Sequence, residues 1–94
     1  MINWGNVSRH FENIKCSMSN WKMTNEVKDY PYSFDIMLDN IKETGMAMVI
    51  FEDTESTNGN YAPICQTLNG IVRIYAKNIP FKNINIRSIE YIEQ

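Results

Sequence analysis

The spacing of apolar residues changes at Gly45, and this change constrains the fold more than any other feature of the sequence. Before Gly45, apolar residues recur at steps of three and four, which is typical of one face of an α-helix. After Gly45 they form short runs and alternating patterns, which are typical of β-strands. Helical patterns followed by consecutive strands predict an α+β fold.

Two helices are expected in the first half of the chain. The apolar spacing over residues 3–22 predicts the first helix, and we expect its apolar face to pack on a sheet. Because this spacing is heptad-like, a homodimer seam is the alternative role of the helix. Residues 34–44 predict a second, shorter helix, with Ser33 as its N-cap and Gly45 just past its last turn. The apolar stripe of the first helix consists of Trp4, Val7, Phe11, Ile14, Met18 and Trp21.

The β part is expected to span residues 46–92. Met46 to Phe51 is apolar at every position, which predicts a strand buried on both faces at the centre of the sheet. Residues 61–68 predict a second strand. Pro63 has no N–H to donate to a neighbouring strand, so it favours a sheet edge or a bulge for this one.

The last third of the chain predicts a hairpin and two more strands. Asn69-Gly70 is the pair preferred in a type I′ turn, and it leads into a strand over residues 71–77. A last strand begins at Ile84, with a bulge near Ser88, where the alternation of apolar residues fails. The stretch from Gly70 to Ile92 resembles the closing strands of SH3-like and Sm-like small barrels. We therefore expect two N-terminal helices packed on an antiparallel sheet of about four strands, arranged as a meander or a small SH3-like bent barrel.

Length and charge limit the classes of function. The 94 residues are enough for a single domain, residues 1–94, and 44% apolar with 21% charged residues is ordinary for a globular protein. A net charge of −2 does not favour a polyanion such as DNA as partner. The start of the chain has neither the basic nor the apolar region of an export signal. We therefore expect a cytoplasmic protein in which Cys16 and Cys65 are reduced thiols.

The sequence offers little for catalysis or metal binding. His10 is the only histidine, and its spacing from Cys16 and Cys65 matches no zinc motif. We expect no metal, no cofactor and no enzymatic activity. A minimal thiol enzyme that uses Cys65 and His10 is the least favoured of the alternatives.

The leading hypothesis is a protein-binding module that acts as a small inhibitor, adaptor or regulator. Tyr30 and Tyr32 flank Pro31 in a predicted linker, and two aromatic rings on a stiffened loop lose little entropy on binding. Glu52, Asp53 and Glu55 cluster in a polar loop that could attract a basic partner. The identity of that partner is left open.

Two further interpretations accompany this hypothesis. A strand face with Arg73, Tyr75 and Lys77, together with Arg87, could stack bases and neutralise phosphates, so a nucleic-acid-binding small barrel is the alternative function. About a quarter of the residues are Asn or Ile, a composition that accompanies AT-rich coding sequence. One form of the leading hypothesis is therefore an anti-defence protein of a phage or mobile element, of the anti-CRISPR type.

Overall fold

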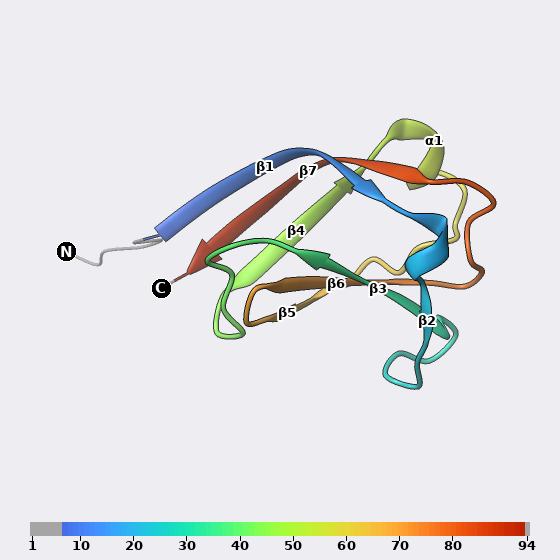
Figure 1. The fold of residues 1–94 in the computed structure, drawn as a ribbon, viewed down its shortest axis with the longest axis horizontal. Coiled ribbons are helices and arrows are strands. Elements are labelled where there is room, and N and C mark those ends of the chain that lie inside the picture. The colour runs from blue at the N-terminus through green and yellow to red at the C-terminus, as the bar shows by residue number, and fades with distance from the viewer. Residues whose placement is uncertain (1–6, 94) are drawn as a thin grey trace.

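The computed structural model describes residues 7–93, which form two antiparallel β-sheets (Figure 1). One sheet has the strand order β1-β7-β4, and the other has the order β2-β3-β6-β5. The expected α+β fold is therefore wrong. The strands are β1 (Val7–Cys16), β2 (Lys22–Met23), β3 (Tyr32–Met37), β4 (Met46–Phe51), β5 (Gln66–Leu68), β6 (Ile71–Ala76) and β7 (Ile84–Glu93).

Helical structure is confined to two short turns, the 3-10 turn η1 (Met18–Asn20) and the single-turn helix α1 (Asp53–Ser56), among the described residues. The second of these lies in the stretch that the sequence predicted to be a polar loop. Neither segment has the length and apolar composition of a membrane span.

The predicted helix over residues 3–22 is replaced by the long strand β1. Phe11 and Ile14 both pack against the core, although an undisturbed strand would turn residues three apart to opposite faces. Asn13 lies between them with φ of +53°, a left-handed conformation that asparagine tolerates better than most residues. This residue interrupts the alternation of side chains between the two faces of β1, so Phe11 and Ile14 lie on the same face. Their separation of three residues is the spacing that indicated a helix.

The rest of the predicted helical stripe is also redistributed. Trp21 is buried after η1, and Met18 within η1 is exposed. Trp4 lies outside the described residues. Without a helix over residues 3–22, the proposed helical dimer seam has no structural basis.

The predicted helix over residues 34–44 is replaced by β3 and the turn after it. Phe34 and Ile36 are buried, with less buried residues between and after them, which is the two-residue period of a strand. Ile41 is buried too, but it lies in the turn, beyond Asn40 with φ of +67°. Its position matches a helical step because the chain reverses direction there.

Several local predictions are confirmed. Asn69-Gly70 forms the turn between β5 and β6, as predicted, and Gly70 has φ of +75°. The predicted type I′ geometry is wrong, because that turn needs a positive φ at both central residues and Asn69 is not among the residues with positive φ. A bulge lies near Ser88, as predicted: Ile50 of β4 pairs with Ser88 and Phe51 pairs with Ile86, so Arg87 is the extra residue of β7. These features depend on neighbouring residues, which a sequence displays directly.

The arrangement of the strands differs from the predicted meander or small bent barrel. The central strand β7 pairs with β1 and β4, so the two ends of the described chain lie side by side (Figure 1). Met46–Phe51 is a strand, as predicted, but it lies at a sheet edge and not at the centre. The predicted strand 61–68 is reduced to β5, which lies at the edge of its sheet, and Tyr61 contributes one isolated bridge to Ala76.

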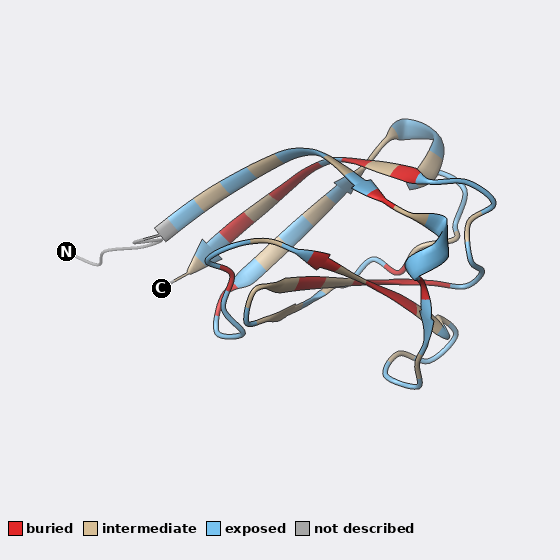
Figure 2. Ribbon diagram, viewed as in Figure 1, coloured by how far each residue is buried: buried red, intermediate tan, exposed pale blue. Residues whose placement is uncertain are grey.

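The core lies between the two sheets, where buried segments of β3, β6 and β7 meet (Figure 2). Val72 and Ile74 from β6, and Ile86 and Ile89 from β7, are at most 2% exposed. Burying such a side chain contributes about 1.5–3 kcal/mol. The interior faces of β6 and β7 therefore supply much of the stabilisation that joins the two sheets.

Gly45, which the sequence assigned to a helix end, has a packing role at the start of β4. A Cβ atom at this position would overlap the ring of Tyr91, which is fully buried. The Tyr91 hydroxyl accepts a hydrogen bond from the Lys42 backbone N–H at 3.0 Å. The missing side chain of Gly45 lets the turn before β4 close over this tyrosine.

Candidate functional site

Strand β4 is an apolar edge of the three-stranded sheet. All six of its residues are apolar, and their side chains alternate between the two faces. Met46 and Met48 are 78% and 63% exposed, and Ile50 is also exposed. Ile92, opposite Met46 on β7, extends this patch. Because proteins usually protect sheet edges with charge or cover, an exposed apolar edge is a candidate binding surface.

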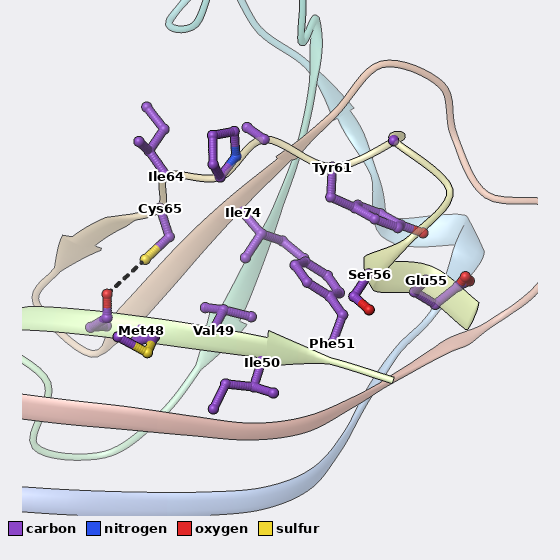
Figure 3. Close-up of a pocket in the computed structure, with 14 residues that line it drawn as sticks. Met48, Val49, Ile50, Phe51, Glu55, Ser56, Tyr61, Ile64, Cys65 and Ile74 are labelled. Atoms are coloured by element: carbon purple, nitrogen blue, oxygen red, sulfur yellow. Dashed lines mark hydrogen bonds between the residues drawn. The ribbon is translucent and has the colours of Figure 1, made fainter. Parts of the chain in front are cut away.

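A groove of about 650 Å³ runs along this edge, between β4 and residues 61–65 (Figure 3). Ile74 of β6 lies at the back of the groove. At one end the rings of Phe51 and Tyr61 stack with their centroids 4.6 Å apart. The lining is mostly apolar, and its charged member is Glu55, beside the stacked rings.

The backbone of β4 directs hydrogen-bonding groups into this groove. The Ala47 carbonyl accepts a hydrogen bond from the Cys65 thiol at 3.3 Å, and the Gly45 carbonyl accepts one from the Thr67 hydroxyl at 2.8 Å. Both carbonyls therefore point away from β7. Alternate residues of a strand direct their backbone groups to the same side, so the N–H and C=O of Val49 point the same way.

A second hollow, of about 640 Å³, adjoins the groove, and Glu55 and Tyr61 line both. Its lining includes Tyr32, at the start of β3, and Phe81, in the loop between β6 and β7. Phe81 is 98% exposed. Burial raises the pKa of Tyr61 to about 12, so its hydroxyl stays protonated and can donate a hydrogen bond. The other lining residues are Asn58, Asn60, Asn78, Ile79, Pro80 and Lys82.

The structure separates the two tyrosines of the predicted linker. Tyr32 is half-buried, packs against the core and also lines the second hollow. Tyr30 is half-buried as well, and the Lys77 ammonium lies 5.7 Å from its ring centroid in a cation–π contact. Tyr32 thus contributes to the candidate surface, whereas Tyr30 already has an intramolecular partner for its ring.

The acidic residues lie on and beside α1. The Arg87 guanidinium is 2.9 Å from an Asp53 oxygen and 3.5 Å from a Glu52 oxygen. Glu55 accepts a weak hydrogen bond from Asn58 at 3.4 Å. The structure therefore brings Glu55 together with Tyr32, while Glu52 and Asp53 share a cation of the same chain.

The basic residues proposed for nucleic acid lie in different sheets, Arg73 on β6 and Arg87 on β7. Arg73 donates two hydrogen bonds to Asp35, at 2.6 and 3.1 Å, and two of 3.0 Å to Glu26. Asp35 above all raises the pKa of this guanidinium. Tyr75, expected on an outward face, is only 2% exposed, and its hydroxyl donates to Glu26. Both arginines thus form ion pairs with carboxylates of this chain.

The histidine and the cysteines also lie apart. Both ring nitrogens of His10 bond to carboxylates, Nε2 to Glu12 at 2.8 Å and Nδ1 to Glu90, and these bonds raise the pKa of His10. Burial raises the pKa of the Cys16 thiol to about 12 and also raises the pKa of Cys65. Within residues 7–93 no three His, Cys, Asp or Glu side chains gather where they could hold a metal ion.

Sequence reasoning missed most of the residues that line the two hollows. The Met46–Phe51 run was the available signal for the groove, but a strand that is apolar on both faces reads as buried unless its neighbours are known. Phe81 follows Ile79-Pro80, a segment interpreted only as the end of a strand. Comparison of the chain with protein-family models, with curated proteins and with solved structures finds no match.

Proposed function

We propose that this protein is a non-enzymatic protein-binding module that acts as an inhibitor, adaptor or regulator. The observation that carries the proposal is the continuous surface formed by the groove and the second hollow, which meet at Glu55 and Tyr61. Phe81 lines the second hollow and is almost fully exposed. Aromatic anchors surrounded by partly buried residues are typical of the energetic centres of protein interfaces.

The chemistry of the other candidate residues supports binding over catalysis. A thiol whose pKa is raised by burial is protonated at neutral pH and is a poor nucleophile. Arg73 and Arg87, the guanidinium groups of the alternative nucleic-acid face, are both paired with carboxylates. A cytoplasmic location and a role against host defence remain parts of this proposal that depend on the identity of the partner.

Affinity purification with matched variants tests the proposal. The wild-type chain, Phe81→Ala and the control Met37→Ala serve as baits in a lysate of the source organism. Met37 is also exposed, but it lines neither hollow. We expect a partner that Met37→Ala retains and that Phe81→Ala binds at least about tenfold more weakly, because interface aromatics often contribute about 2 kcal/mol or more.

The melting temperature of Phe81→Ala should change by no more than a few degrees, because the ring buries almost no surface in the free protein. Equal recovery of the same partner by all three baits would place the contact elsewhere and contradict the proposed surface.

A further inference from the structure

We propose that the groove beside β4 binds an extended segment of a basic partner protein, which adds to the three-stranded sheet as a fourth strand. This inference rests on the proposed function, because it names the kind of partner that the surface takes. Three properties of the groove support it: free backbone groups, an apolar interior and an uncompensated carboxylate.

The backbone of Val49 provides the first property. Its N–H and C=O point away from β7, at the edge where, within residues 7–93, no further strand is hydrogen-bonded to β4. A strand added there would lie about 4.8 Å from β4 and pair with both groups. This is the mode in which extended peptides bind to sheet edges, and main-chain hydrogen bonds supply much of their affinity.

The interior of the groove provides the second property. Side chains on the inner face of an added strand would enter the space between β4 and residues 61–65, with Ile74 behind them (Figure 3). Ala47, Val49 and Phe51 are the β4 residues on this side, and the first two are small enough to leave room beside the Phe51 ring at the end of the groove. Such lining selects apolar residues at alternate positions of the partner.

Glu55 provides the third property. It lines the groove beside Phe51 and Tyr61, and among residues 7–93 no cationic side chain pairs with it, whereas Asp53 pairs with Arg87. The whole chain carries a net charge of −2. A lysine or arginine in the bound segment, near the Phe51 end of β4, therefore complements the groove.

The shape of the edge favours a single segment over a second copy of this chain. The Cys65 thiol covers the Ala47 carbonyl and the Thr67 hydroxyl covers the Gly45 carbonyl. The open part of the edge is therefore short and flanked by residues 61–65. A second copy would bring its own segment 61–65 to the same place, while a lone extended chain needs the width of one strand.

The test uses the full chain and a synthetic peptide, Lys-Val-Thr-Val-Thr-Val with blocked ends. Two further peptides carry N-methyl groups on the backbone, one on the first, third and fifth residues and the other on the second, fourth and sixth. In an added strand, alternate N–H groups face β4 and the others face away. We expect one methylated peptide to bind like the parent and the other to lose at least about tenfold in affinity.

Binding is followed by the amide resonances of the protein, and slower hydrogen exchange at Val49 is the expected mark of strand addition. Equal binding of both methylated peptides would show that side chains alone hold the peptide, and would overturn the proposal. No change at Val49 with millimolar parent peptide would overturn it as well, as would a stable dimer of the free protein that the peptide does not dissociate.

The charge is tested by Glu55→Gln and by a peptide with glutamine in place of lysine. Each change should weaken binding about two- to fivefold, as for a partly exposed ion pair, and the two together should cost little more than one alone. Fully independent effects would remove the proposed lysine contact. If the natural partner depends on Phe81 while the peptide fails, the protein-binding function stands and only the strand addition is wrong.

Discussion

The three-stranded sheet has two edges, and they are built differently. At one edge, β1 carries Arg9, His10, Glu12 and Lys15, and Asn13 with its positive φ breaks the regularity of the strand. At the other edge, β4 has neither a charged residue nor a positive φ among its six residues. Charges and irregularities protect sheet edges from pairing with other chains. The comparison shows that one chain can protect one edge of a sheet with charge and leave part of the other edge open.

Burial does not account for the lack of charged residues in β4. β4 exposes Met46 and Met48 on its outer face, so it has space for the same charged residues that β1 carries. Methionine is a flexible side chain that adapts to different partners and is common on binding surfaces. The core therefore does not require the exposed methionines of β4, and they are consistent with the binding surface proposed above.

The largest expected effect is a loss of stability when β7 is altered, because this central strand pairs with both edge strands. Ile89 is fully buried and pairs with Phe11 of β1 on one side and Val49 of β4 on the other. Ile89→Ala should lower the free energy of unfolding by about 2–5 kcal/mol, measured by urea denaturation. Ile92→Ala on the same strand, whose side chain is half exposed, should cost about 0.5 kcal/mol. A similar cost at both positions would mean that β7 does not connect the two edges through the core.

An effect of intermediate size is expected on aggregation when a charge is added to β4 or removed from β1. Met48→Lys gives β4 a charge like those of β1, and Lys15→Val removes one from β1. Both changes should alter the free energy of unfolding by about 0.5 kcal/mol or less. We expect Met48→Lys to slow aggregation in light scattering of the heated protein, and Lys15→Val to accelerate it. Unchanged rates in both variants would show that the charge on an edge does not control association.

The smallest effect concerns the pH dependence of the β1 edge. Hydrogen bonds from His10 to Glu12 and Glu90 raise its folded-state pKa above the ordinary value of 6.5. Its contribution to stability is therefore complete below about pH 6.5 and is lost as the pH rises through the folded pKa. The stability difference between wild type and His10→Gln should shrink over that range, in urea denaturation at several pH values. A constant difference would contradict the assignment, and Glu12→Gln should lower the histidine pKa measured by nuclear magnetic resonance.

Features that depend on neighbouring residues could be predicted from the sequence. The hairpin at Asn69-Gly70 and the bulge near Ser88 belong to this class. The two predicted helices failed because β1 pairs with β7, at the other end of the chain, and β3 pairs with β6, and no local pattern shows either pairing. Where local spacing and long-range pairing disagree, as at Asn13, the pairing determines the structure.

The candidate surface was predictable only in part. Tyr32 and Glu55 were selected for their residue types, and the fold places both at one hollow. Tyr75 was expected on an outward face because it alternates with Ile74, but its hydroxyl has partners in Glu26 and Gln66, so the ring is buried. The cover over a sheet face comes from loops distant in sequence, and alternation within a strand carries no information about it.

The contact between Gly45 and Tyr91 has a consequence for how this sequence can diverge. A side chain at position 45 and a large ring at position 91 compete for one volume, so the two positions must change together. A relative with a small residue at 91 is free to carry alanine or serine at 45, whereas one with tyrosine or phenylalanine at 91 must keep glycine. The separation of 46 residues, with the glycine just before an apolar run, gives a paired pattern by which distant descendants of this fold can be recognised where overall similarity has been lost.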